Sequence, residues 1–237
     1  MVNQKLIEKL VKDFGEPYSE KLKIRLEKDS KSLFEWFLAS ILFGARISEK
    51  IAIKTFNEFR KSRLLTPEAI LKAGWDRLVE VLDMGGYVRY DFKTATKILE
   101  IAKKLKQDYN GNLLKLYEKA SDSKDLEKRL LEFKGVGETT INIFLRELRE
   151  KLEKSNPPLS QTAFLAAYNL GLIKTKNRMK ALENLKLTWE KYRVKGKSFL
   201  NLETALTKIG KNYCKNAKCN ICPVKSFCKR KAAFQKL

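Results

Sequence analysis

Apolar residues recur every three or four positions along most of the chain, which is the spacing of amphipathic α-helices. Over residues 1–14, Leu6, Leu10, Val11 and Phe14 share one face of such a helix. Alternating runs of β-branched residues, which indicate strands, are nearly absent. We therefore predict an all-α protein of about a dozen helices.

Residues that start and stop helices divide this pattern into segments. The pair Thr66-Pro67 predicts a helix start, and Gly74 predicts its end. Another helix is predicted over 75–82, followed by a loop at 83–87. Asp91 is expected to cap the long helix that comes next. After a breaker at Asn156-Pro157-Pro158, further helices are predicted from Ser160 to Gly171, at 177–191 and at 198–209.

Two helical patterns meet at a glycine corner over residues 126–152. Leu126, Leu130 and Phe133 precede the run Lys134-Gly135-Val136-Gly137, and a second apolar face follows it. Glycine permits a positive φ and leaves no Cβ in the path of a ligand. The N–H groups at the start of the second helix form an anion site. An ordinary corner between two helices is the simpler interpretation, because Gly-x-Gly alone is a weak signal.

Charge makes a polyanion the expected partner. The 237 residues carry 50 Lys and Arg against 28 Asp and Glu, for a formal net charge of +22, and no histidine. Such an excess favours nucleic-acid binding that weakens with salt. The chain has neither an apolar run long enough to span a membrane nor a signal peptide. We expect a cytoplasmic, nucleoid-associated monomer with no membrane partner.

All four cysteines lie within 15 residues, at Cys214, Cys219, Cys222 and Cys228. Thiolates this close favour zinc or an iron–sulfur centre. Two disulfides are the alternative, although they are rare in the cytosol. Nearby lysines either contact a phosphate backbone or only solvate the loop.

The hairpin run Leu-Glu-Phe-Lys-Gly-Val-Gly-Glu-Thr-Thr, together with the cysteines, resembles the endonuclease III (HhH-GPD) superfamily of DNA glycosylases. The resemblance implies a two-lobed all-α fold with DNA across the cleft between the lobes. The six-helix barrel would cover 30–142 and end in the helix-hairpin-helix. The second lobe would combine 1–29 with 143–212, and the iron–sulfur loop would cover 213–230.

The same resemblance implies a structural 4Fe–4S cluster on the four cysteines. The family spacing is C-x6-C-x2-C-x5-C, and this chain has C-x4-C-x2-C-x5-C. The last two gaps match, and the first is shorter by two residues. Zinc remains the alternative metal.

The catalytic positions depart from the family. The lysine of bifunctional members, two residues past the second hairpin glycine, corresponds to Thr139, and the family's aspartate corresponds to Ser160. Ser160 can cap a helix but cannot act as a carboxylate. Replacement carboxylates would be Glu138, Asp91 or Asp83. Their simpler roles are a partner of the helix dipole, a helix cap and a loop surface residue, respectively.

The resemblance predicts a DNA base-excision repair glycosylase, with or without AP lyase activity, that flips a modified or mismatched base out of double-stranded DNA. The alternative is a damaged-DNA-binding protein without catalysis on the same scaffold. The expected DNA contacts are Arg46, Tyr87, Lys134, Gly135, Val136, Gly137, Thr139, Thr140 and Ser160. Tyr87 either stacks on a base or fills a lobe interface.

Overall fold

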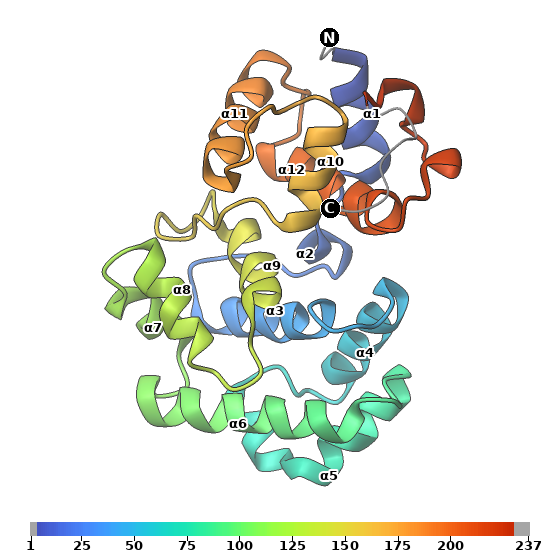
Figure 1. Ribbon diagram of the computed structural model, residues 1–237. Coiled ribbons are helices and arrows are strands. Elements are labelled where there is room, and N and C mark those ends of the chain that lie inside the picture. The colour runs from blue at the N-terminus through green and yellow to red at the C-terminus, as the bar shows by residue number, and fades with distance from the viewer. Residues whose placement is uncertain (1–3, 230–237) are drawn as a thin grey trace. The chain divides into compact units, whose positions relative to one another are not determined.

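The computed structural model describes residues 4–229, and these are helical and connecting segments only (Figure 1). The first three residues of the expected N-terminal helix and residue 230 of the expected cysteine loop lie outside this range. The α-helices are α1 (Gln4–Phe14), α2 (Tyr18–Lys21), α3 (Ser30–Phe43), α4 (Glu49–Lys61), α5 (Pro67–Gly85), α6 (Asp91–Tyr109), α7 (Leu113–Lys119), α8 (Ser123–Leu131), α9 (Glu138–Leu148), α10 (Gln161–Asn169), α11 (Arg178–Lys191) and α12 (Phe199–Ile209). Within residues 4–229, no helix has the length and apolar character needed to cross a membrane.

The chain forms two compact units. One combines the N-terminal segment through Tyr18 with the chain from Pro158 onwards, and the other is Ser19–Pro157. Residues 19–29 and 143–157, which we assigned to the second lobe, thus belong to the unit that contains α3. The physical reason is the apolar face of α9, where Phe144 packs edge-on against Phe37 of α3 with ring centroids 5.0 Å apart.

Helix α3 is the centre of the Ser19–Pro157 unit, because α4, α7 and α9 all pack against it. Trp36 and Phe37 of this helix are fully buried. The Trp36 indole N–H donates to the carbonyl oxygen of Phe144 at 2.9 Å, which ties α3 to α9. The hairpin that precedes α9 is therefore mounted on the core of this unit.

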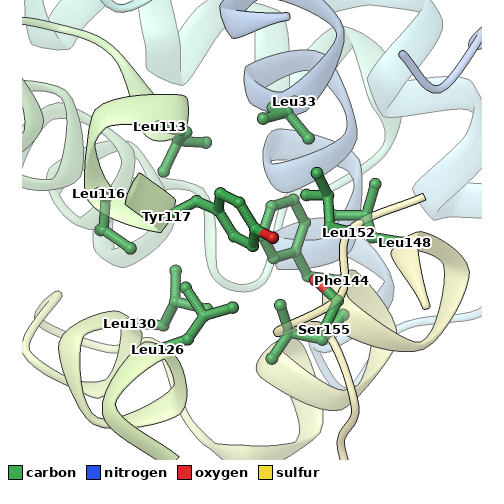
Figure 2. A pocket seen from close by; sticks show the side chains of 11 residues that line it. Leu33, Leu113, Leu116, Tyr117, Leu126, Leu130, Phe144, Leu148, Leu152 and Ser155 are labelled. Atoms are coloured by element: carbon green, nitrogen blue, oxygen red, sulfur yellow. The ribbon is translucent and has the colours of Figure 1, made fainter. Parts of the chain in front are cut away.

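A small apolar cavity of about 10 Å³ lies where α3, α7, α8 and α9 meet (Figure 2). Leu33, Tyr117, Leu130 and Phe144 contribute to its wall, one from each of these helices. Its volume is about that of a single water site, so it is a packing defect and not a ligand pocket.

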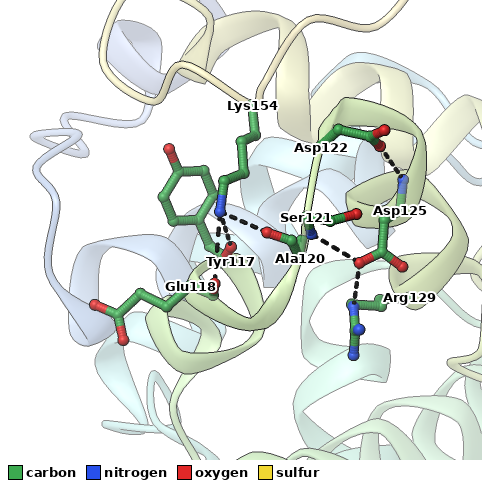
Figure 3. Close-up of polar contacts among 8 residues, drawn as sticks. All are labelled: Tyr117, Glu118, Ala120, Ser121, Asp122, Asp125, Arg129 and Lys154. Atoms are coloured by element: carbon green, nitrogen blue, oxygen red, sulfur yellow. Dashed lines mark hydrogen bonds and ion pairs between the residues drawn. The ribbon is translucent and has the colours of Figure 1, made fainter.

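The connector after α9 is fixed by Lys154. Its ammonium group donates to the carbonyl oxygens of Tyr117 and Ala120 at 3.2 and 2.5 Å and lies 4.9 Å from the centroid of the Tyr117 ring (Figure 3). A cation here compensates the partial negative charge at the end of α7. In the same view Asp122 accepts the N–H of Asp125 and thereby caps α8, the first helix of the hairpin.

The other unit has its own core, built from α1, α10, α11 and α12. The side-chain amide of Asn201 in α12 donates to the carbonyl oxygen of Gly15 at 2.9 Å, and Lys208 donates to that of Glu16 at 2.6 Å. These two bonds hold the N-terminal segment against a helix that follows it by more than 180 residues.

Candidate nucleic-acid interface and cysteine loop

The hairpin occupies residues 132–137 between α8 and α9. Phe133 is fully buried against Phe37, with ring centroids 5.9 Å apart, and the Val136 side chain is buried as well. The Val136 N–H donates to the carbonyl oxygen of Phe133 at 3.0 Å. Lys134 and Gly137 face solvent. The apolar residues thus anchor the corner from inside, while its glycines stay accessible.

Gly135 has a φ of +79°, which residues with a Cβ adopt only with strain. The side chain of Lys97, from α6, lies across it: a Cβ built on Gly135 would be 2.6 Å from Cδ of Lys97. Burial lowers the pKa of the Lys97 amine, and the positive charge of nearby Lys93 lowers it further. A lysine from a distant part of the sequence is therefore held against the hairpin backbone.

Helix α9 begins with its N–H groups uncovered. Its N-cap is Gly137, whose backbone is extended, and within residues 4–229 no side chain caps this helix start. A Cβ built on Gly137 would meet nothing within 4 Å. Glu138 and Thr139, the first residues of the helix, are exposed. This corner combines free N–H donors, the positive end of a helix dipole and open space, which are the requirements for binding an anion.

Helix α10 begins differently, although the sequence analysis placed both helix starts in the site. Its N-cap is Ser160, whose Oγ accepts the N–H of Ala163 at 3.1 Å and lies 3.2 Å from Oγ1 of Thr162. Ser160 therefore does what its residue type predicts, which is to cap the helix. Its hydroxyl is already engaged within the chain.

Thr140 does not face outward as expected. Its side chain is buried against the end of α3, where a Cβ built on Gly44 would be 2.4 Å from Oγ1 of Thr140. The expectation failed because Thr140 lies on the face of α9 that packs on α3. The same contact places Arg46, which is exposed and two residues past Gly44, close to the start of α9.

Tyr87 is also buried, with 3% of its surface exposed, so its ring does not present a face to a base. Burial raises the pKa of the Tyr87 phenol, against the opposing effect of a hydrogen bond with Thr94 of α6. The structure favours neither expected role of Tyr87, neither a base-stacking ring nor a lobe-interface residue, because the side chain is buried within the Ser19–Pro157 unit. The packing involves α6 of the same unit.

The three candidate acids are all at the surface or near it. Asp83, at the end of α5, is exposed, and its pKa is raised by loss of hydration and by the hydrogen bond and like charge of Asp91. Asp91 is the first residue of α6 and not its N-cap, which is Tyr90; its Oδ1 accepts the N–H of Phe92 at 2.8 Å. Glu138 lies beside the open helix start of α9.

The four cysteines lie on the segment that follows α12. Cys214 ends a π-helical turn, Gly210–Cys214, and Cys219 begins a short 3₁₀ turn. Cys214, Cys222 and Cys228 pack against the core of their unit, and all four thiols are free. Within residues 4–229, no three Cys, His, Asp or Glu side chains are arranged so that they could hold a metal ion.

The cysteines nevertheless influence one another. Burial raises the pKa of the Cys214 thiol, a hydrogen bond with Asn169 opposes this rise, and the charges of the other three cysteines raise the pKa further. The segment is held to α10 through Asn169, whose carbonyl oxygen accepts the N–H of Lys229 at 2.9 Å. Its one fully buried side chain within the described range is Val224. Four thiols on a segment with so little core are a donor set suited to a soft metal.

Sequence reasoning missed Lys97. The spacing of Lys93 and Lys97 on an amphipathic helix indicates that they share a stripe. It does not indicate which element that stripe faces, because the contact with Gly135 joins residues 38 positions apart.

Two solved structures resemble this chain over nearly its whole length. Endonuclease III, in a trapped covalent intermediate with DNA described as an estranged-adenine complex, is 18% identical, with a TM-score of 0.51 and 97% of each chain covered. The H. pylori 3-methyladenine DNA glycosylase MagIII, bound to 1,N6-ethenoadenine, is 14% identical, with a TM-score of 0.55, 90% of this chain covered and 97% of that chain. No family model and no curated protein sequence matches the chain. These similarities confirm the predicted fold: the chain is all-α and has the HhH-GPD DNA glycosylase fold.

Proposed function

We propose that this protein binds double-stranded DNA through the hairpin and acts as a repair glycosylase on a modified or mismatched base that it flips out of the helix. The observation that carries the proposal is the uncapped start of α9 at Gly137, open to solvent on a chain of net charge +22. The DNA glycosylase fold supports the same proposed function.

The hairpin would bind the sugar-phosphate strand and not the bases. Backbone N–H groups at the start of α9 would donate to phosphate oxygens, and the helix dipole would favour the negative charge. Lys134 is exposed in the hairpin itself, Arg46 lies near the start of α9, and Lys97 lies across Gly135. Such contacts fix the position of a duplex without selecting its sequence.

The chemistry would be hydrolysis. Thr139 carries no amine, so the hairpin offers no nucleophile for a Schiff base at the position where bifunctional family members have one. A carboxylate is still needed to activate water or stabilise the developing positive charge on the sugar. Glu138 is the acid nearest the proposed phosphate contact, and the Asp83–Asp91 pair is the other candidate.

We also propose that Cys214, Cys219, Cys222 and Cys228 hold a 4Fe–4S cluster. Four free thiols within 15 residues and a scarcity of buried apolar side chains support a metal centre that stabilises this segment. A bound cluster would cross-link the loop and would take no part in base removal. Brown colour with a visible absorption band, and iron and sulfide in equal amounts, are expected. Colourless protein with one zinc per chain would instead support the zinc alternative.

A non-catalytic damage-binding protein is the second candidate. It is favoured by Thr139 and by the engaged hydroxyl of Ser160, which stand where the family has its lysine and aspartate. The same hairpin would then position DNA for recognition without base removal.

Duplexes that each carry one modified or mismatched base separate these functions. The protein is incubated with each duplex, and half of every sample is treated with alkali, which cleaves at abasic sites. We expect strand breaks only after alkali and no covalent product on addition of borohydride. Breaks without alkali together with a borohydride-trapped product would indicate a lyase. Binding with no cleavage in a broad panel would support the non-catalytic function, and no DNA binding at all would contradict both.

A further inference from the structure

Two aromatic rings stand at the surface of the Ser19–Pro157 unit. Trp75 of α5 and Phe92 of α6 have ring centroids 5.3 Å apart with an angle of 42° between their planes. Trp75 is 37% exposed and Phe92 is 60% exposed. Single apolar side chains on a surface are ordinary, but large ones that lie together mark an interaction site.

The pair is held in place by hydrogen bonds. The Trp75 indole N–H donates to Oγ1 of Thr96 at 2.9 Å, and that hydroxyl donates to the carbonyl oxygen of Phe92 at 2.9 Å. The indole is therefore fixed against α6 before any ligand arrives. A surface that is ordered in advance loses less conformational entropy on binding.

The backbone also contributes to this arrangement. Gly74, directly before Trp75, has φ +75° and ψ −178°, a conformation essentially restricted to glycine, and it breaks α5 into two helical parts. Trp75 thus begins the second part of the helix. The break at Gly74 therefore sets the direction in which the Trp75 ring leaves the helix, and the ring remains partly exposed.

Helix α6 connects the aromatic pair to the hairpin. Phe92 and Thr96 lie one turn apart on one stripe of α6, and Lys93 and Lys97 lie one turn apart on the neighbouring stripe. Lys97 covers Gly135 of the hairpin. From Phe92 to Lys97 the helix rises about 7.5 Å, so the aromatic pair and the lysine on the hairpin lie within two turns of α6.

We propose that Trp75 and Phe92 form a stacking platform for an unpaired nucleobase on DNA held by the hairpin. The proposal rests on the proposed function, because the hairpin must bind DNA first. Phosphates would follow the Lys93–Lys97 stripe, and the uncharged face of the base would lie on the rings. Two rings cover much less area than a stable protein–protein interface needs, but they match the size of one base. The expected ligand class is duplex DNA that contains a gap, bulge or other unpaired nucleotide.

Intrinsic fluorescence reports on this platform. Of the three tryptophans, Trp36 is fully buried and Trp189 is 5% exposed, so Trp75 is the one accessible to a base. The full-length protein is titrated with two DNAs of equal length, one fully paired and one with a short gap. We expect strong quenching with gapped DNA and little with paired DNA. In Trp75→Phe the quenching should vanish while gapped-DNA affinity stays near that of the wild type.

Affinity measurements complete the test. Trp75→Ala and Phe92→Ala should each weaken binding to gapped DNA about fivefold or more and leave paired-duplex binding unchanged. Leu187→Ala, which removes a 69% exposed apolar side chain from α11, is the matched control and should change neither. Thermal unfolding shows whether each variant is folded. If Trp75→Ala does not fold, the affinity of Phe92→Ala alone tests the platform.

The possible failures are distinguishable. If the wild type binds both DNAs but neither alanine variant changes the affinity for gapped DNA, the platform is wrong and the hairpin proposal stands. If the wild type binds neither DNA, the proposed function fails, and the platform fails with it.

Discussion

Two helix starts, those of α9 and α10, occupy the positions where the family resemblance placed the reaction, and they are built in opposite ways. Helix α9 starts at Gly137 with no side-chain cap in the described chain and with open space in front of it. Helix α10 starts at Ser160, whose hydroxyl accepts an N–H of its own first turn. The same unsatisfied N–H groups are thus left for a ligand in one case and satisfied internally in the other.

This difference is not a general property of the chain. Among α3 to α12 in the described part, eight helices have an N-cap side chain that accepts a backbone N–H, and only α6 and α9 do not. Helix α6 also reaches the hairpin that precedes α9, because Lys97 of α6 covers Gly135. A missing cap leaves the first N–H groups of a helix available to a ligand, at a cost in local stability.

The largest expected effect concerns salt, because an open helix start serves a polyanion only as part of a wider basic surface. If about 6–10 phosphates are contacted, raising salt from about 50 to 200 mM should lower affinity for duplex DNA about 10³-fold or more. Fluorescence anisotropy with one labelled duplex at several salt concentrations gives the slope. A flat response would show that the net charge serves another purpose.

The next effect tests the open start directly. Gly137 has a φ of −118° and an unobstructed Cβ direction, so residues with side chains fit there without strain. Gly137→Asp should weaken DNA binding about tenfold or more, because a carboxylate takes the N–H groups and repels phosphate. The same variant should unfold at the wild-type temperature or slightly above it, since Asp is a good N-cap.

Alanine and asparagine at position 137 are the matched controls. Alanine adds bulk alone, and asparagine adds a cap without charge, so affinity should decrease in the order Ala, Asn, Asp. Equal affinities in all three variants would remove the hairpin from the DNA-binding surface.

Lys97 should show a conflict between binding and stability. Its folded pKa lies below the unfolded value of 10.5, so its favourable contribution is fully present only above pH 10.5 and declines from there until it is lost as pH falls through the folded pKa. At neutral pH, Lys97→Met should therefore raise the free energy of unfolding. It should also weaken DNA binding severalfold and reduce the salt slope by about 0.9, the value for one phosphate contact.

Lys104 on the same helix provides the contrast. It pairs with Asp108 at 2.7 Å, and that hydrogen bond raises the pKa of its amine. Lys104→Met should leave DNA affinity nearly unchanged and should not stabilise the fold. Identical behaviour of the two variants in both assays would mean that Lys97 has no special relation to the hairpin.

The smallest effect belongs to the closed helix start. Ser160→Ala should lower the free energy of unfolding by about 1 kcal/mol, and Ser160→Asp should restore it, because both Ser and Asp cap helices well. Chemical denaturation measures both changes. DNA affinity should not change in Ser160→Ala; a loss comparable to that of Gly137→Asp would mean that Ser160 belongs to the DNA-binding surface after all.

The sequence predicted the helices and many of their boundaries, because caps and breakers act within a few residues. Thr66 caps α5 with its hydroxyl 3.1 Å from the Ala69 N–H, and Gly74 interrupts that helix as expected. Ser160 likewise caps the start of α10 as expected. The site was predicted less completely: the hairpin glycines are accessible, but Thr140 and Tyr87 proved to be buried.

By itself, then, the sequence determined that the protein is helical and basic, with a glycine corner between two amphipathic helices and four clustered thiols. Only the tertiary structure decided which side of each helix is covered, because burial depends on neighbours distant in sequence. Packing of α9 on α3 removed Thr140 from the surface, and α6 brought Lys97 onto Gly135. Local rules fix where a helix begins, but long-range packing fixes whether its first N–H groups remain available to a ligand.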